Sequence, residues 1–374
     1  MALIKSKHVL VTGSNGFIGR NLVIRLKQEK LEVGEFNRKD DISVLEELIS
    51  KTSCIVHLAG ENRPQDVTQY WNCNFGLTKK ICEIVSKSGK KIPIIFSSSS
   101  QVKLENLYGK SKTAAEDILH KYCNDTVVNA RVFRFPGIFG KWAKPNYNSV
   151  VSTFCYNIAR ELPIEISNES TVLDLCYIDD VIDLLVEQVH DVIRGYSQFD
   201  IVGKYQITIG ELAEKLNLFK ISRDTLLIGR VGTALDRALY ATYLSYLPQD
   251  KFTYPLVAHE DERGKFVEVL KTLDSGQISY ISIKPGATRG GHFHHTKSEK
   301  FIVLNSQAIY KCKNILSGEG FEKIISGLAE NRVIETIPGW AHEITNIGID
   351  DMLVLIWSNE VFDASKPDTF TYRT

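Results

Sequence analysis

Two groups of residues in this 374-residue chain have the types and spacing that chemistry needs, and the first is Tyr108 with Lys112. Their spacing puts both side chains on one face of a helix, about a turn apart. An ammonium near a phenol lowers the phenol pKa, so the tyrosine can exchange a proton near neutral pH. The apolar run before them ends in serines 97–100, whose hydroxyls can orient a carbonyl that is being reduced. Such a pair also occurs by chance on exposed helices.

The second group is His292, His294, Glu299 and His342. On a strand, alternate residues share a face, so His292 and His294 point the same way, and Glu299 can return on the next strand. Three imidazoles and a carboxylate are a competent ligand set for zinc or another divalent ion. A single histidine is more often an ordinary hydrogen-bonded residue, but the joint pattern predicts a metal site.

A glycine-rich turn must position the first group. A β-branched run ends at Thr12, Gly13, Gly16 and Gly19 follow, and apolar residues then recur at helical spacing. A strand, turn and helix of this kind directs backbone N–H groups and a helix N-terminus at a phosphate. The pattern predicts a dinucleotide-binding turn; the alternative is a plain strand-to-helix turn.

The next apolar strand, 31–36, ends in Asn37 and Arg38. Folds that use NAD usually place a carboxylate here for the ribose hydroxyls, whereas a guanidinium can hold a 2′-phosphate. We therefore expect NADPH, against the alternative of a solvated basic turn.

Further strands end in small or polar residues, which lets the cofactor pass close to the backbone. One strand is Cys54 to Gly60, and Asn74 follows it on a helical pattern. The predicted cofactor-binding residues are Gly13, Ser14, Asn15, Gly16, Phe17, Ile18, Gly19, Asn37, Arg38, Leu58, Ala59, Gly60, Asn74, Tyr108 and Lys112. The loop 134–148 carries lysines, a tryptophan and asparagines, which suit a sugar diphosphate, or it is an irregular surface loop.

Near residue 246 the apolar period changes from helical to alternating, with many short strands and turns. This predicts two domains, 1–245 and 246–374, the second an all-β sandwich or barrel. Lysine plus arginine and aspartate plus glutamate are 45 each, so charge indicates neither nucleic acid nor a membrane as partner. Scattered cysteines, no long apolar run and no signal-peptide pattern predict a cytoplasmic protein.

Residues 8 to about 240 resemble an extended short-chain dehydrogenase/reductase. The matching motifs are Gly13/Gly16/Gly19, His57-Leu-Ala-Gly60, Phe96-Ser-Ser-Ser99, Tyr108-Gly-Lys-Ser-Lys112, Arg134-Phe-Pro-Gly-Ile-Phe-Gly140 and Tyr177-Ile-Asp-Asp-Val181. The resemblance implies a Rossmann-like α/β domain with Tyr108 and Lys112 as catalytic residues, and it selects Ser99 as the assisting serine. The chain departs from the family in the short separation of Ser99 from Tyr108.

The stretch from about Phe252 onward resembles a cupin, an all-β jelly roll, with the HxH…E segment at 292–299 and the PGxxH…N segment at 338–346. Ser306 stands where the first cupin motif usually closes with glycine. Asp261-Glu-Arg-Gly and Arg289-Gly-Gly-His292 are also similar to sugar-nucleotide 3,5-epimerases, in which the histidine is a metal-free base. The two resemblances assign His292 differently, as ligand or as catalytic base.

As a whole, with 141–150 and 292–297, the chain resembles the bifunctional capsule and O-antigen enzymes of the CapF/WbjC family. That resemblance implies a UDP-2-acetamido-2,6-dideoxy-hexos-4-ulose substrate. The cupin would invert C3, and the first domain would reduce the C4 ketone with NADPH. The product would be a UDP-N-acetyl-L-talosamine-type precursor of UDP-N-acetyl-L-fucosamine. We also expect a Zn²⁺ or other divalent ion in the cupin, and a homodimer.

Two other functions stay open on the sequence alone. The cupin can be a structural or dimerising part of a plain nucleotide-sugar 4-reductase. The chain can also be a redox-sensing NADP-binding protein without turnover, although such a sensor has no need of the Tyr108/Lys112 pair.

Overall fold

The computed structural model describes residues 7–126 and 128–372. The chain divides into two compact units. The first comprises Met1–Leu216 and Ala238–Leu247, and the second comprises Asn217–Arg237 and Pro248–Thr374. Residues 217–237 thus group with the second unit, whereas the sequence predicts a single boundary near residue 246.

The first unit is built on a parallel sheet with the strand order β2-β1-β3-β4-β5-β8. Its strands are β1 (His8–Thr12), β2 (Glu32–Phe36), β3 (Cys54–His57), β4 (Pro93–Ser99), β5 (Asn129–Phe135) and β8 (Tyr196–Asp200). The central strands read as continuous apolar runs because helices cover both faces of the sheet. The predicted Rossmann-like fold is confirmed.

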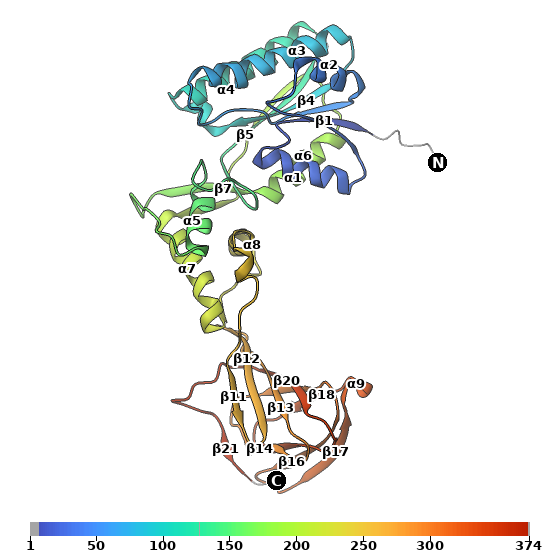
Figure 1. Cartoon of the computed structure of the whole chain (residues 1–374), viewed down its shortest axis with the longest axis vertical. Coiled ribbons are helices and arrows are strands. Elements are labelled where there is room, and N and C mark those ends of the chain that lie inside the picture. The colour runs from blue at the N-terminus through green and yellow to red at the C-terminus, as the bar shows by residue number, and fades with distance from the viewer. Residues whose placement is uncertain (1–6, 127, 373–374) are drawn as a thin grey trace, which may run out of the picture. The chain divides into compact units, whose positions relative to one another are not determined.

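Successive residues of β1 show the two layers. Val9 and Val11 pack with α1 (Phe17–Gln28) and α6 (Ile178–His190). Leu10 faces the other way, into a core that includes side chains of α2, α3 and α4. These three helices, drawn on the opposite face of the sheet in Figure 1, are α2 (Ile42–Lys51), α3 (Leu77–Ser88) and α4 (Leu107–Asp125). Because all the strands of this sheet are parallel, their carboxyl ends lie at one edge, where such sheets bind ligands.

Smaller elements complete this part of the chain. A second sheet has the order β6-β7-β9. The remaining elements before the β-rich region are η1 (Tyr70–Gly76), η2 (Ser100–Lys103), β6 (Gly137–Phe139), α5 (Val150–Ala159), β7 (Val172–Tyr177), β9 (Tyr205–Thr208), α7 (Ile209–Thr225), β10 (Leu227–Ile228), α8 (Ala234–Ser245) and η3 (Gln249–Lys251). Residues of α7 and α8 contribute to both units.

The second unit is a sandwich of two sheets, as predicted for an all-β region. One sheet has the order β10-β12-β13-β20-β15-β18, with β11 beside β12, and the other has the order β17-β16-β19-β14-β21. The strands are β11 (Ala258–Asp261), β12 (Gly264–Thr272), β13 (Gln277–Ile283), β14 (Thr288–Phe293), β15 (Glu299–Val303), β16 (Gln307–Asn314), β17 (Gly320–Ser326), β18 (Val333–Thr336), β19 (Trp340–Asn346), β20 (Met352–Ser358) and β21 (Phe370–Thr371). A short helix, α9 (Gly327–Glu330), follows β17.

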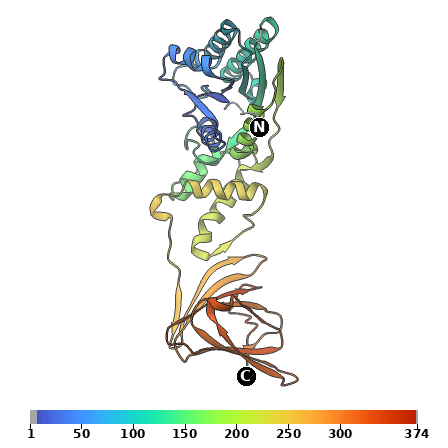
Figure 2. The same cartoon turned by 90° about the vertical axis from the view of Figure 1, so that its right-hand side faces the viewer.

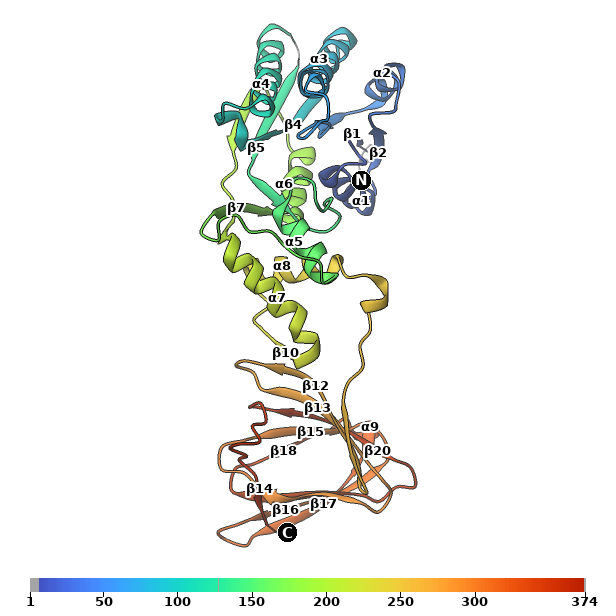
Figure 3. The ribbon, with the colours of Figure 1, turned by 60° about the vertical axis from the view of Figure 1, so that its left-hand side comes forward.

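Alternating side chains of the two sheets form one apolar core. Ile283 and Val354 come from one sheet and Tyr310 and Ile344 from the other. Figure 2 and Figure 3 show the two sheets of this unit facing each other. In residues 7–126 and 128–372, no helix has the length and hydropathy that crossing a bilayer requires.

Candidate active sites

The glycine turn between β1 and α1 has a geometry that only glycine fits. Gly13 has a positive φ of 69°, and a Cβ there would lie 2.8 Å from the backbone of Ala59. A Cβ on Gly19 would lie 2.1 Å from the Gly13 carbonyl oxygen. Helix α1 and strand β1 therefore approach each other as closely as a dinucleotide-binding turn requires. The N-cap residue of α1 is Gly16, which has no side chain to bond the first backbone N–H groups of the helix, so these groups can bind a phosphate.

Asn37 is tied to this turn rather than pointing away from it. Its Oδ1 accepts a hydrogen bond from the Asn15 amide (2.9 Å), and its Nδ2 donates to the Ser14 hydroxyl (2.8 Å). The end of β2 is thus held beside the turn. A neutral amide stands where a carboxylate would repel a 2′-phosphate.

Arg38 pairs with Glu61, a residue that the sequence analysis missed. The guanidinium is 67% exposed and the carboxylate 11%, and the Tyr147 hydroxyl donates to the other oxygen of Glu61 (2.9 Å). Burial alone would raise the pKa of Glu61, but hydrogen bonds from Arg38 and Tyr147 outweigh it and lower the pKa. Glu61 follows Gly60, just beyond the carboxyl end of strand β3. Ligand-binding residues of such sheets gather at the carboxyl ends of the strands, so this position could have marked Glu61 as a candidate.

The loop after β3 is held from behind by Asn74. Its Oδ1 accepts from the Glu61 amide (2.8 Å), and its Nδ2 donates to the Glu61 carbonyl and the Ser111 hydroxyl (2.9 Å each). The Ala59 amide donates to the Thr12 hydroxyl (3.2 Å), and Leu58 packs against the core of the α1 face. The fully buried Asn74 therefore positions the loop whose backbone was predicted to approach the cofactor.

Ser99 and Tyr108 meet although few residues separate them. The short η2 turn follows β4, and the Asn106 side chain caps α4 by accepting from the Gly109 amide (2.7 Å). The chain thus turns back at once, and the Ser99 side chain lies close enough to Tyr108 to lower the pKa of its hydroxyl. The short connection therefore still permits the predicted contact.

The pKa of Tyr108 is raised, whereas the nearby Lys112 was expected to lower it. Burial raises the pKa to about 12, and the nearby Ser99 side chain offsets this rise only in part. Burial also lowers the pKa of Lys112 to about 8. The Lys112 Nζ donates to the Ser97 carbonyl (2.8 Å) and lies 4.6 Å from the centre of the Phe96 ring. The Lys112 ammonium is thus held against strand β4 by the Ser97 carbonyl and the Phe96 ring. The pKa of the Tyr108 hydroxyl is determined mainly by its burial.

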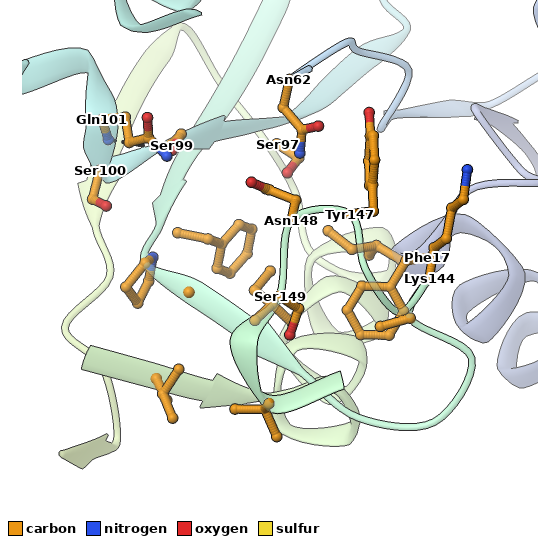
Figure 4. A pocket seen from close by; sticks show the side chains of 18 of the residues that line it. Phe17, Asn62, Ser97, Ser99, Ser100, Gln101, Lys144, Tyr147, Asn148 and Ser149 are labelled. Atoms are coloured by element: carbon orange, nitrogen blue, oxygen red, sulfur yellow. Dashed lines mark hydrogen bonds between the residues drawn. The ribbon is translucent and has the colours of Figure 1, made fainter. Parts of the chain in front are cut away.

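A cavity of about 650 Å³ joins these elements. Its lining includes the glycine turn at 15–18, the serines and Gln101 at 97–101, Tyr108 and the loop 142–149. Figure 4 shows Ser99, Asn62, Tyr147 and Asn148 around the same space. Asn37, Arg38, Asn74 and Lys112 lie outside this lining.

The loop predicted to hold a sugar diphosphate divides into two roles. Lys144 and Asn148 line the cavity, whereas Lys141 pairs with Asp179 (2.6 Å). Arg134 is turned inward to Glu116 (2.5 Å). Sequence analysis also missed Asn62 and Gln101, which lie just after strands β3 and β4 and so had the same strand-end signal.

In the second unit, His292, His294, Glu299 and His342 converge. One candidate ligand atom from each residue lies within 4.8 Å of the others. His292 of β14 stands opposite His342 of β19, and Glu299 begins β15 in the facing sheet. His294 Nε2 is 3.5 Å from Glu299 Oε2, and His342 Nε2 is 3.8 Å from it.

These residues fit a divalent ion. Among the described residues, the buried Nε2 atoms of His294 and His342 have no hydrogen-bond partner, which is costly unless another group binds them. Burial lowers the pKa of His342 to about 4, so its imidazole is neutral and able to ligate. Burial would raise the pKa of Glu299, but His294 and Lys297 hold it well below its usual range. Lys297, whose Nζ lies 2.8 Å from Glu299 Oε1, was not predicted.

Comparison with known proteins agrees with this architecture. Residues 9–196 match the model of the NAD dependent epimerase/dehydratase family, and 259–370 match the polysaccharide biosynthesis C-terminal domain. The chain is 47% identical over 363 residues to a UDP-2-acetamido-2,6-beta-L-arabino-hexul-4-ose reductase of Pseudomonas aeruginosa, covering 97% of each.

Two solved structures extend the similarity to the fold of the whole chain. The capsular polysaccharide assembling protein CapF from Staphylococcus aureus matches with a TM-score of 0.90 and 36% identity, over 98% of this chain and 100% of that one. A structure of CapF with the inhibitor 3-isopropenyl-tropolone matches with a TM-score of 0.85 and 34% identity, over 98% and 100%. The chain therefore belongs to the NAD dependent epimerase/dehydratase family, and over its full length to the group that includes this reductase and CapF.

Proposed function

We propose that the protein converts a UDP-2-acetamido-2,6-dideoxy-hexos-4-ulose by C3 epimerisation and then C4 reduction with NADPH. The product is a UDP-N-acetyl-L-talosamine-type precursor of UDP-N-acetyl-L-fucosamine for capsule or O-antigen. The observation that carries the proposal is the 47% identity to a hexul-4-ose reductase over nearly the whole of both chains. The contact of Ser99 with Tyr108 and the histidine cluster support a site for each step.

The first unit would carry out the reduction. NADPH, when bound, supplies the hydride that reaches C4. Tyr108 gives its hydroxyl proton to the C4 oxygen, and Ser99 orients that oxygen by hydrogen bonding. Lys112, with its pKa near 8, keeps a positive charge beneath the site at neutral pH and stabilises the phenolate that remains. The lining of the cavity by Lys144 and Asn148 supports binding of the diphosphate there.

The second unit would carry out the epimerisation. The C3 proton is acidic because C4 is a ketone, and its removal leaves an enolate that can be reprotonated from the opposite face. A divalent ion supplies Lewis acidity for that charge. His292 is partly exposed, whereas His294, Glu299 and His342 are buried, which favours His292 as the residue that reaches the substrate. Base and metal ligand remain competing roles for it.

NMR of the reaction tests the proposal with the full chain and 4-keto-6-deoxy sugars derived from UDP-GlcNAc. Without NADPH, the C3 position should exchange its proton for solvent deuterium. With NADPH, the ketone should disappear and an inverted, reduced sugar should form. Reduction without C3 exchange would instead favour a plain reductase with a structural second unit.

The finer parts of the proposal concern organisation. Residues 1–245 would form the NADPH-binding reductase domain and 246–374 the cupin, which holds Zn²⁺ or another divalent ion. We also propose a homodimer located in the cytoplasm. Support for the dimer comes from a row of apolar residues on the outer face of one sheet, where Leu355 stands opposite Tyr280 and Ile302. Light scattering of the purified protein tests the dimer, since a monomer at micromolar concentration would contradict it.

A further inference from the structure

The segment that ends the described chain returns to the strand bearing the histidines. Strand β21 pairs with β14, with Thr371 opposite His292 and Phe370 opposite Phe293. The Tyr372 amide donates to the Gly291 carbonyl (2.9 Å). The rings of Phe293 and Phe370 stack at 5.5 Å. This segment therefore pairs with the strand that carries His292.

Asp368, just before β21, holds the loop that joins two of the candidate ligands. Its Oδ1 accepts from the His295 amide (2.9 Å), and its Oδ2 accepts from the amides of Thr296 (2.7 Å) and Lys297 (2.8 Å). The Thr296 hydroxyl donates to the same Oδ2 (3.0 Å). Four donors thus converge on one carboxylate, and the loop they fix runs from His294 to Glu299.

The main chain of Asp368 also contacts a ligand directly. Its carbonyl oxygen pairs with Nδ1 of His294, which assigns the proton of the imidazole to Nδ1. In the neutral imidazole the lone pair is then on Nε2, the buried nitrogen that lies 3.5 Å from Glu299 Oε2. Carbonyl partners of this kind fix the tautomer and the ring orientation of metal-bound histidines.

We infer that Asp368 is a positioning residue of the divalent-ion site, an inference that rests on the proposed function. Its side chain fixes the path from His294 to Glu299, and its carbonyl selects the ligating tautomer of His294. The site therefore needs a residue 74 positions beyond His294 as well as its four candidate ligands.

The test compares zinc affinity in full-length Asp368→Ala and the wild type, by competition with a chromophoric chelator. We expect Asp368→Ala to bind about 10- to 100-fold more weakly, the usual cost of losing such a partner. Asp363→Ala is the matched control, because the Asp363 carboxylate bonds to Ser365 within its own segment. Affinity unchanged within twofold in a folded Asp368→Ala would overturn the inference.

Two further measurements separate positioning from general stability. Asp368→Asn keeps one acceptor oxygen and should recover part of the affinity that alanine loses. In ¹⁵N NMR of the metal-free protein, the His294 ring should carry its proton on Nδ1 in the wild type and also in Asp368→Ala, because alanine keeps the main-chain carbonyl at position 368. A wild-type ring with its proton on Nε2 contradicts the assigned tautomer, and an Asp368→Asn variant that binds zinc no better than Asp368→Ala contradicts the role of the side chain. A wild type that binds no zinc would overturn the proposed metal site itself.

Discussion

The Arg38 guanidinium pairs with the Glu61 carboxylate, which also accepts the hydroxyl of Tyr147. Arg38 lies at the predicted 2′-phosphate position, whereas Tyr147 lines the cavity. One buried carboxylate thus joins a candidate coenzyme contact to the wall of the candidate substrate cavity. A 2′-phosphate would compete with Glu61 for the same guanidinium.

Arg38→Ala should weaken NADPH binding about 10- to 100-fold and leave NADH nearly untouched, since a charge-assisted hydrogen bond contributes about 1.5–3 kcal/mol. Fluorescence titration of both coenzymes measures the effect. Lys39→Ala, at the next and exposed basic residue, is the control and should change little. Equal catalytic efficiency with NADPH and NADH in the wild type would contradict the predicted preference.

Tyr108→Phe should slow ketone reduction by about 10²- to 10⁴-fold, because the ring stays in place and only the proton donor is lost. NADPH binding should be retained. Lys112→Met should likewise lose turnover. NADPH oxidation in the presence of the keto sugar measures both, and Tyr122→Phe on the same helix is the control. A normal rate in Tyr108→Phe would rule out this active site.

His292→Asn should abolish C3 exchange in the full chain without NADPH, whether this residue is base or ligand. His342→Ala should lower the zinc content, because it removes one of four candidate ligands. Chelation then separates the roles of His292. Exchange that survives in metal-free, folded protein favours a histidine base, and exchange that stops and returns with zinc favours a Lewis-acid role.

Acid should destabilise the first unit through His57. Burial lowers the pKa of this imidazole to about 3, and its nitrogens bond to the hydroxyls of Thr12 (2.7 Å) and Thr78 (2.9 Å). Between its ordinary pKa of 6.5 and this value, the unfolded chain binds a proton that the folded chain excludes, so stability falls as pH falls.

The loss of unfolding free energy from pH 7 to pH 5 due to His57 is about 2 kcal/mol. Denaturant unfolding of wild type and His57→Gln at the two pH values measures it, and the variant should show a smaller loss. His120→Gln, an exposed histidine on α4, should behave as the wild type does. Equal losses in wild type and His57→Gln would contradict the assignment.

Local patterns in the sequence were enough to predict which candidate residues lie on one turn, helix face or strand face. The glycines at 13–19 and the Tyr108/Lys112 spacing are such patterns, and alternation placed His292 and His294 together. Contacts between distant residues carry no such signal: Tyr147 meets Glu61 across 86 positions, and His294 meets Asp368 across 74. The pKa of Tyr108 was expected to fall, but burial depends on the whole packing around the ring and raises it.

The grouping of 217–237 with the second unit has a consequence for cutting this chain into parts. In that segment β10 pairs with Lys271 and Thr272 at the end of β12, and Arg230 pairs with Asp274 (2.7 Å). A fragment that starts at residue 246 would keep β11 beside the first part of β12 but would leave Lys271 and Thr272 without their strand partner on that side, and uncovered strand edges promote aggregation. A gene fragment for the β-sandwich should therefore begin upstream, near Asn217, and a graft of another sandwich onto this reductase should carry its own covering strand.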